Sequence, residues 1–405
     1  MKKWGEVALG IVTSIGGFLE VGSIATSTQA GAEFGYQLAW VVLLGAISLA
    51  FLMEMTGRLA AVSQRTYADL LRERFGYRFF LLPLFAVFVV SLLVLASEIG
   101  GVAIALQMAT GISFRWWAIP VALLGWLLLW RGTFGIVEKG TATLGLIAIV
   151  FAVGALKLHP EWPELGRALL PSAPSNDRAR YWYLAVSILG ASISPYLYLF
   201  YSAGALEDQW TIEHLGVNRI TAGLGNVFGG VLAIAALVAA ALVLSPREIQ
   251  VDRYEQIALV LASPLGRAGF VFFLATLCIT CFGSTVEIVL AIAYLLAQGF
   301  GWNWSENLKP GKDARFSTAY TVLILLAAVP IAVGVEPLAL TNVSMVATAA
   351  SLPFTVIPLL VLMNDGDVLM KYVNGWTTNI ALVIIALLSL ALLLSAVPLQ
   401  LLGGG

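Results

Sequence analysis

The chain is dominated by long apolar runs that are almost free of charge. Hydrophobic residues make up 60% of its 405 residues and charged residues 11%, whereas roughly 25% of residues carry charge in a typical soluble domain. About 20 apolar residues in a helix cross a hydrocarbon core of about 30 Å, and such a segment must satisfy its own backbone polar groups. The chain is therefore expected to fold as an all-α polytopic membrane protein in contact with the lipid bilayer.

Eleven apolar runs are long enough to span a membrane. The weakest of them, 116–132, is short. No signal-peptide cleavage site separates residues 1–6 from the first run, which is expected to stay in place as a helix. The runs cover residues 8–36, 37–60, 79–109, 116–132, 134–156, 182–206, 217–245, 268–299, 316–334, 339–363 and 376–398.

Basic residues are unevenly distributed over the loops between these runs. With the N-terminus in the cytoplasm, the inner loops hold fourteen of the 22 Lys and Arg residues and the outer loops hold eight. An excess of Lys and Arg marks the cytoplasmic side of a membrane protein. We therefore expect a multi-pass protein of a bacterial-type inner membrane, with the N-terminus cytoplasmic and the C-terminus outside.

Two of the runs are interrupted near their middles. In the first run, Gly16, Gly17 and Gly22 surround Glu20, and in the sixth run Pro195 stands at the centre. Proline removes one backbone hydrogen bond and kinks or unwinds a helix. Unwound backbone at membrane depth is tolerated only where it is buried in protein or lines a cavity. Packing glycines and kink prolines without further function are the alternative explanation for each break taken alone.

The two interrupted runs hold corresponding places in two sets of five. Paired interruptions of this kind point to a central binding site in transporters built from inverted repeats. The sequence predicts one transmembrane transporter domain over residues 1–405. Its repeats are expected at approximately 8–156 and 182–363, with an extra helix at 376–398.

Several segments resemble the NRAMP family of divalent-metal transporters, in the family's order from about residue 8 to residue 370. Residues 24–36 are similar to the segment that follows the family's Asp-Pro-Gly-Asn metal motif. Residues 53–59 and 72–76 resemble the surroundings of its second helix, and residues 351–360 resemble its tenth. The resemblance implies a LeuT/APC-type 5+5 inverted repeat of about eleven helices in which helices 1 and 6 are broken.

The family's metal-binding motifs are altered in this chain. Placed by its flanks, Asp-Pro-Gly-Asn becomes Glu-Val-Gly-Ser at 20–23, and the sixth-helix Met-Pro-His-Asn becomes Ser-Pro-Tyr-Leu at 194–197. The next sixth-helix histidine becomes Tyr201, and the tenth-helix glutamine becomes Met345. By the resemblance, the residues expected to bind substrate are Glu20, Gly22, Ser23, Ser194, Tyr196 and Tyr201.

The altered centre admits more than one kind of substrate. In the family, the methionine sulfur favours soft transition metals, whereas here Ser194 offers an oxygen. Glu20, Ser23, Ser194 and freed carbonyls would give a divalent metal an all-oxygen shell, which suits Mg²⁺ or Mn²⁺. Alternatively, Glu20 faces a small organic solute, for which Tyr196 and Tyr201 supply aromatic faces. A third alternative is a relative that does not transport.

Four glutamates lie inside the apolar runs, where a charge costs on the order of 3 kcal/mol on insertion scales. Glu20 lies on the first break itself. Glu98 matches a third-helix carboxylate that the family links to proton movement, and Glu287 is a further candidate for the substrate pathway. Glu54 precedes Arg58 by one helical turn, which predicts a structural ion pair.

The histidines, the cysteines and the net charge limit the functions that the chain can have. The two histidines, His159 and His214, lie in loops, so we expect uptake driven by the solute's own gradient or coupling carried by Glu98 alone. Cys278 and Cys281 are expected to be ordinary buried thiols. A net charge of −1 offers no basic patch for nucleic acid, and no enzyme motif is present. We expect a monomeric transporter without a resident cofactor, and not an enzyme.

Overall fold

The computed structural model describes residues 19–131, 140, 146–174, 176–305, 310 and 312–404, and over these residues it contains helices and no strands. Its α-helices are α2 (Val21–Phe34), α3 (Ala39–Ser63), α4 (Tyr67–Phe75), α5 (Tyr77–Thr110), α6 (Phe114–Trp130), α8 (Ile149–Lys157), α9 (Trp162–Ala168), α10 (Arg178–Ser192), α11 (Pro195–Glu207), α12 (Leu215–Val243), α13 (Tyr254–Phe300), α14 (Ala314–Ala332), α15 (Pro337–Ser351), α16 (Pro353–Leu362), α17 (Gly366–Leu369) and α18 (Trp376–Gly403).

Within the described residues, eight segments are long and apolar enough to cross a membrane, by length and composition. They match eight of the eleven predicted runs, because hydropathy over about 20 residues is a local property. The predicted runs 8–36 and 134–156 lie partly outside the described residues, and 116–132 corresponds to the shorter apolar helix α6. The eight segments are 39–63, 77–110, 178–207, 212–247, 254–300, 314–332, 337–362 and 376–403.

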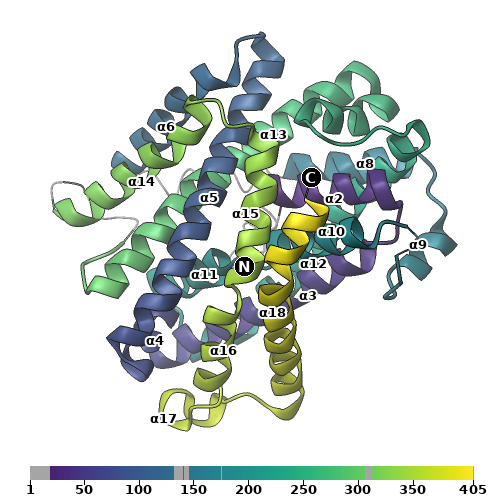
Figure 1. Cartoon of the computed structure of the whole chain (residues 1–405). Coiled ribbons are helices and arrows are strands. Elements are labelled where there is room, and N and C mark those ends of the chain that lie inside the picture. Colours follow the sequence, from purple (N-terminus) through teal and green to yellow (C-terminus); the bar gives the residue numbers. More distant parts are fainter. Residues whose placement is uncertain are drawn as a thin grey trace.

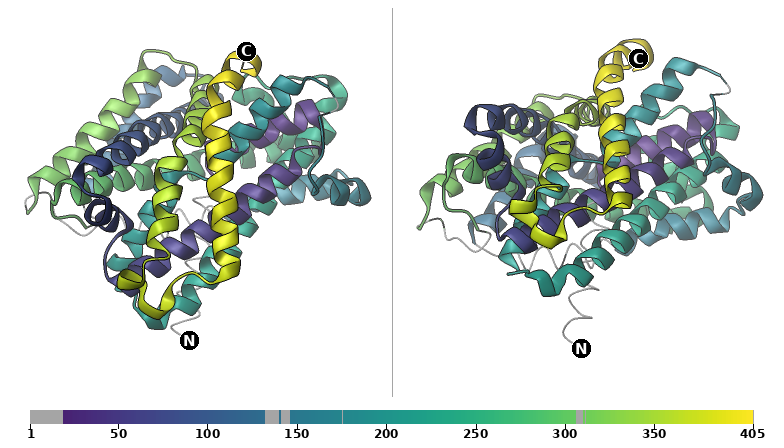
Figure 2. Two further views of the ribbon diagram at one scale, coloured as in Figure 1. Left: turned by 60° about the horizontal axis from the view of Figure 1, so that its bottom comes forward. Right: turned by 90° about the horizontal axis from the view of Figure 1, so that it is seen from below.

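The helices pack into one bundle around α2, α5, α10 and α15 (Figure 1). Helix α5 lies against α13 and α15, while α12 lies against α2 and α3. Helix α18 packs on α10, α15 and α16 and runs along one side of the molecule (Figure 2). Its outer face carries exposed apolar residues such as Leu394 and Leu401, as expected of a helix that faces lipid.

The predicted break in the sixth span is confirmed. Helix α10 ends at Ser192, and Ile193 and Ser194 have non-helical backbone angles (φ −118°, ψ 59° and φ −75°, ψ 125°). Pro195 is then the first residue of α11. Proline is favoured at this position, because the first helical N–H has no intrahelical partner and the fixed φ suits the helix.

The first span is also non-helical just before α2. Glu20 has extended backbone angles (φ −85°, ψ 173°), and the helix begins at Val21. The glycines predicted to take part in this break, Gly16 and Gly17, lie outside the described residues. The structure thus shows where α2 begins, and the preceding part of the predicted break lies outside the described residues.

Two other spans differ from the prediction. Helix α13 begins at Tyr254 and not near residue 268, and it changes direction at Gly266, which has φ 63° and ψ −144°. Polar residues near Tyr254 led to the prediction of a loop before residue 268, but residues 254–265 form the first arm of a kinked helix. The tenth span is divided into α15 and α16 at Leu352, just before Pro353. Between α8 and α10 lies the short, exposed helix α9.

We expect Gly190→Ala to destabilise the protein. A Cβ on Gly190 of α10 would lie 1.9 Å from the carbonyl oxygen of Met345 in α15, so the two backbones would have to separate. Overpacking of this kind costs about 1–3 kcal/mol, and thermal unfolding in detergent micelles measures it. The matched control is Gly204→Ala in α11, where a Cβ meets nothing within 4 Å. Equal melting temperatures for the two variants would contradict the close approach of α10 and α15.

Candidate substrate-binding site

The two helix breaks meet at the Glu20 carboxylate. Glu20 is fully buried, and the Tyr196 hydroxyl donates a hydrogen bond to its Oε2 atom at 2.6 Å. The Ser194 hydroxyl lies 3.4 Å from Glu20 Oε1 and 3.3 Å from the Gly190 carbonyl oxygen, so its one proton serves either acceptor. Glu20, Ser194 and Tyr196 are thus brought together as the sequence predicted, although 174 and 176 positions separate the bonded residues.

Glu98 supports the same centre from α5. Its side chain is fully buried, and its Oε1 atom accepts a hydrogen bond from the backbone N–H of Val21 at 3.1 Å. The first N–H groups of a helix lack intrahelical partners, so this bond satisfies one of them at the start of α2. Among the described residues, the second oxygen, Oε2, has no hydrogen-bond partner. Glu98 therefore holds α2 in place, and its carboxylate also faces the Cys281 thiol of α13.

Helix α13 forms the wall beyond Glu98. A Cβ on Gly101, one turn after Glu98, would lie 2.7 Å from the Cys281 sulfur, so α5 and α13 are in close contact here. Glu287 lies further along α13, is half-buried, and is near enough for its charge to act on both Tyr196 and Glu98. The structure thus gathers three of the four intramembrane glutamates around Tyr196.

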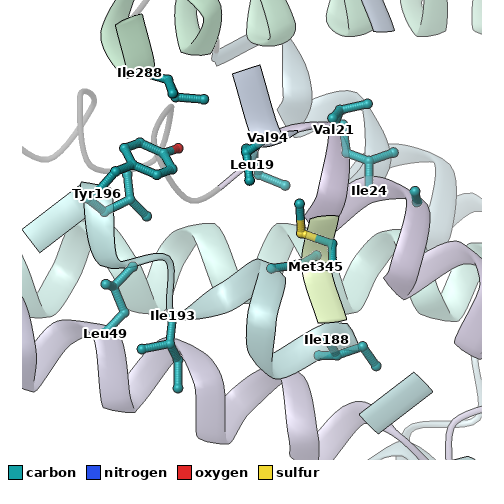
Figure 3. Packing of buried hydrophobic residues seen from close by; sticks show 14 of the residues in the cluster. Leu19, Val21, Ile24, Leu49, Val94, Ile188, Ile193, Tyr196, Ile288 and Met345 are labelled. Atoms are coloured by element: carbon teal, nitrogen blue, oxygen red, sulfur yellow. The ribbon is translucent and has the colours of Figure 1, made fainter. Parts of the chain in front are cut away.

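Met345 of α15 closes the site on another side. A Cβ on Gly22 would lie 2.4 Å from the Met345 sulfur, so only glycine leaves room for the thioether beside the first turn of α2. In Figure 3 the Met345 side chain points toward the start of α2, where Leu19 and Val21 lie. The sequence comparison placed Met345 only by register. Two glycines in the sequence could have indicated that Met345 reaches the site. Gly22 leaves room for the Met345 sulfur, and Gly190 leaves room for the Met345 carbonyl oxygen.

Of the remaining predicted residues, Ser23 lies near Glu20, whereas Tyr201 belongs to a separate hydrogen-bond network. Ser23 is buried in the first turn of α2, three positions after Glu20. Tyr201 lies elsewhere, because its hydroxyl donates to Asn218 Oδ1 of α12 at 3.0 Å. Asn218 in turn donates to the Glu54 carbonyl oxygen of α3 at 2.8 Å. These bonds place Tyr201 in a contact between α11, α12 and α3 and not around Glu20.

The ion pair predicted between Glu54 and Arg58 is confirmed, with Arg58 Nε 3.1 Å from Glu54 Oε1. The Arg58 guanidinium also donates to the Tyr372 carbonyl oxygen at 2.8 Å and to Asn374 Oδ1 at 2.7 Å. The pair therefore ties α3 to the segment before α18. It satisfies the Glu54 charge within the protein, which separates Glu54 from the other intramembrane glutamates.

The donor atoms at the centre are mainly oxygens. In the described part of the chain, no group of three or more His, Cys, Asp or Glu side chains is placed to hold a metal ion. Glu20 offers a cation a carboxylate here, and Ser194 and Tyr196 offer hydroxyls. The Met345 thioether is a soft donor beside the first turn of α2.

A helical bundle in which two interrupted spans meet at a buried carboxylate is the architecture of a LeuT-type membrane transport protein. The family model described as natural resistance-associated macrophage protein-like (Nramp) matches residues 10–397, and the chain belongs to this family.

Relatives with curated names cover almost the whole chain. A divalent metal cation transporter, MntH, of Deinococcus radiodurans is 25% identical over 398 residues, which cover 93% of this chain and 87% of the relative. The MntH protein of Aeromonas hydrophila subsp. hydrophila is 27% identical over 379 residues, with 90% and 88% covered.

Solved structures show the same fold. A manganese transporter of Eremococcus coleocola, in complex with an aromatic bis-isothiourea substituted compound, has a TM-score of 0.77 at 20% identity and covers 96% of this chain and 86% of its own. Mhp1, a nucleobase-cation-symport-1 family transporter, has a TM-score of 0.59 at 13% identity, with 97% and 91% covered. The LeuT-like fold expected from the resemblance is thereby confirmed.

Tyr196→Phe should destabilise the protein through Glu20. A hydrogen bond to a charged group contributes about 1.5–3 kcal/mol, and loss of the hydroxyl leaves Glu20 Oε2 without this donor. The matched control is Tyr198→Phe, whose hydroxyl pairs with the Thr355 hydroxyl and not with a carboxylate. In a Glu20→Gln background the cost of Tyr196→Phe should shrink and that of Tyr198→Phe should not, as thermal unfolding of the double mutants will show. Additive costs for Tyr196 and Glu20 would contradict the contact.

Proposed function

We propose that this protein moves a divalent metal cation across the membrane and that Glu20 is the charged ligand. The observation that carries the proposal is the setting of Glu20. It is a fully buried carboxylate at the meeting of two helix breaks, and its hydrogen bonds among the described residues come from hydroxyl groups and not from a basic side chain. A charge at membrane depth normally faces a partner or a water-filled cavity. A cation supplies the positive charge that the described surroundings lack.

The named relatives support a metal as this cation. The two MntH relatives are named divalent metal cation transporters, and the Eremococcus structure is that of a manganese transporter. These names agree with the carboxylate and hydroxyl donors at the breaks, because oxygen donors suit Mg²⁺ and Mn²⁺.

The donor set favours Mn²⁺ over Mg²⁺. Ser23 and Ser194 add hydroxyl oxygens to the Glu20 carboxylate, and the non-helical backbone at Ile193 adds a carbonyl. Met345 brings a thioether to Gly22, and a thioether is a donor for which the hard Mg²⁺ ion has little affinity. Mn²⁺ accepts the same oxygen donors and loses less by meeting a sulfur.

The breaks also support alternating access about this site. Transporters of this architecture rock one group of helices against another around a fixed centre, and broken helices provide the flexible points. The halves that follow each break, α2 and α11, are joined through Glu20 and Tyr196. We place the protein, as a monomer, in a bacterial-type plasma membrane. The loop charges favour a cytoplasmic N-terminus and an external C-terminus.

Glu98 is the residue through which any proton coupling would pass. It is buried, its charge interacts with that of Glu20, and it holds the Val21 N–H. Glu287 is near enough to influence its charge. The two histidines lie in loops, so no imidazole of the chain is available at membrane depth.

Glu20→Gln should abolish uptake of Mn²⁺ into liposomes that contain the purified protein. The variant keeps the shape of the side chain but removes the charge. The loss should reach at least the roughly 10- to 100-fold that removal of an outer-shell partner costs a metal site. Glu73→Gln is the matched control, since Glu73 is an exposed partner of Arg65. Retained Mn²⁺ uptake in Glu20→Gln would contradict the proposal. So would an absence of Mn²⁺ and Mg²⁺ binding to the unaltered protein by calorimetry, which would favour a small organic solute.

Glu98→Gln should leave metal entry without proton movement. In liposomes that hold a pH-sensitive dye, any acidification that accompanies Mn²⁺ entry through the unaltered protein should disappear in Glu98→Gln, because the amide does not release a proton. Downhill Mn²⁺ entry should persist. Acidification that remains proportional to Mn²⁺ entry in the variant would exclude both uncoupled uptake and coupling through Glu98.

A further inference from the structure

A groove of about 750 Å³ lies between the C-terminal part of α5 and α13, away from Glu20. On α13 it is lined by Arg267, Phe270, Leu274 and Cys278, and on α5 by Ala105 and Ala109. Val271 on the same wall is 61% exposed, so the groove opens to the outside of the bundle. Arg267 is its one charged lining residue, and the rest of the lining is apolar.

The groove results from the change of direction in α13. Gly266 has a positive φ of 63°, which directs the arm 254–265 away from the line of the arm 267–300. The two arms are held closely together, because a Cβ on Gly269 would lie 2.0 Å from the Leu261 carbonyl oxygen. The groove is therefore a fixed part of the backbone path and does not depend on side-chain rotamers alone.

The length of the groove matches one leaflet of a bilayer. Arg267, Phe270, Leu274 and Cys278 recur at helical spacing along one face of α13. From Arg267 to Cys278, eleven residues at about 1.5 Å each extend about 16 Å. Half of a hydrocarbon core of about 30 Å is about 15 Å. An acyl chain that enters at the level of Arg267 would thus reach Cys278 near the middle of the membrane.

The charge of Arg267 decides which lipid fits. Among the described residues, Arg267 forms neither an ion pair nor a side-chain hydrogen bond. A basic side chain at the end of an apolar groove attracts the phosphate of an anionic lipid, and arginine binds phosphate through two parallel N–H donors.

We propose that this groove binds one anionic phospholipid, with its phosphate on Arg267 and an acyl chain along α13 as far as Cys278. Cys278 is half-buried and lines the groove, which corrects the prediction that both cysteines are buried, whereas Cys281 is buried. Cys281 lies one turn further along α13 and contacts Gly101 next to the Glu98 wall of the substrate site. The bound lipid therefore packs against the helix that also forms that wall.

Native mass spectrometry of the purified, delipidated full-length protein tests the proposal. Phosphatidylglycerol and phosphatidylcholine with identical acyl chains are titrated in parallel. We expect one phosphatidylglycerol to bind in preference to phosphatidylcholine. Arg267→Gln should weaken phosphatidylglycerol binding about fivefold, the contribution of one basic residue near an anionic surface, and leave phosphatidylcholine binding unchanged. Arg219→Gln, an exposed arginine of α12, is the matched control and should change neither.

A second variant locates the lipid. Ala109→Phe places a ring in the groove from an exposed position of α5, and it should reduce binding of both lipids without loss of thermal stability. Phosphatidylglycerol should also slow modification of Cys278 by a maleimide in the unaltered protein, with Cys278→Ala as the measure of any reaction at Cys281. Equal binding of the two lipids, equal effects of Arg267→Gln and Arg219→Gln, or a Cys278 reaction that phosphatidylglycerol does not slow would each overturn the proposal.

Discussion

The Glu20 carboxylate is the group on which the arrangement of the central helices depends. A buried carboxylate is costly unless it is hydrogen-bonded, and among the described residues the hydroxyl donors to Glu20, from Tyr196 and Ser194, lie at the other helix break. The two breaks must therefore face each other for the charge to be satisfied. The Glu98 bond to Val21 then holds the beginning of α2 against α5. The site and the packing of the first and sixth spans are in this way consequences of one another.

Small residues allow the other helices to approach this centre. Gly22 and Gly190 leave space for the side chain and the backbone of Met345, so α15 reaches both broken spans. Gly101 does the same for Cys281 of α13. Helix–helix contacts in membranes rely on such close approach, because lipid offers no hydrophobic gain for packing. Gly22 also brings the Met345 thioether beside the first turn of α2, which begins directly after Glu20.

Helix α13 connects the interior of the bundle with its lipid-facing side. Cys281 and Glu287 lie on the side of the substrate site, whereas Arg267, Leu274 and Cys278 line the outer groove. The kink at Gly266 shapes the groove. A lipid in the groove would thus contact α13 at Cys278, about one turn from Cys281, which packs against Gly101 beside Glu98.

Local features of the sequence determined the spans, one helix break and one ion pair. Hydropathy over about 20 residues predicted the eight spans that the structure describes, Pro195 predicted the sixth-span break, and the four-residue spacing of Glu54 and Arg58 predicted their ion pair. The pairing of the two breaks also predicted that Glu20 and Tyr196 belong to one central site, and the structure added the hydrogen bond between them. Only the tertiary structure decided that Tyr201 turns to Asn218, that Met345 reaches Gly22, and that Cys278 faces a groove. These outcomes depend on which faces of distant helices meet, and no periodicity within a single helix encodes its neighbour.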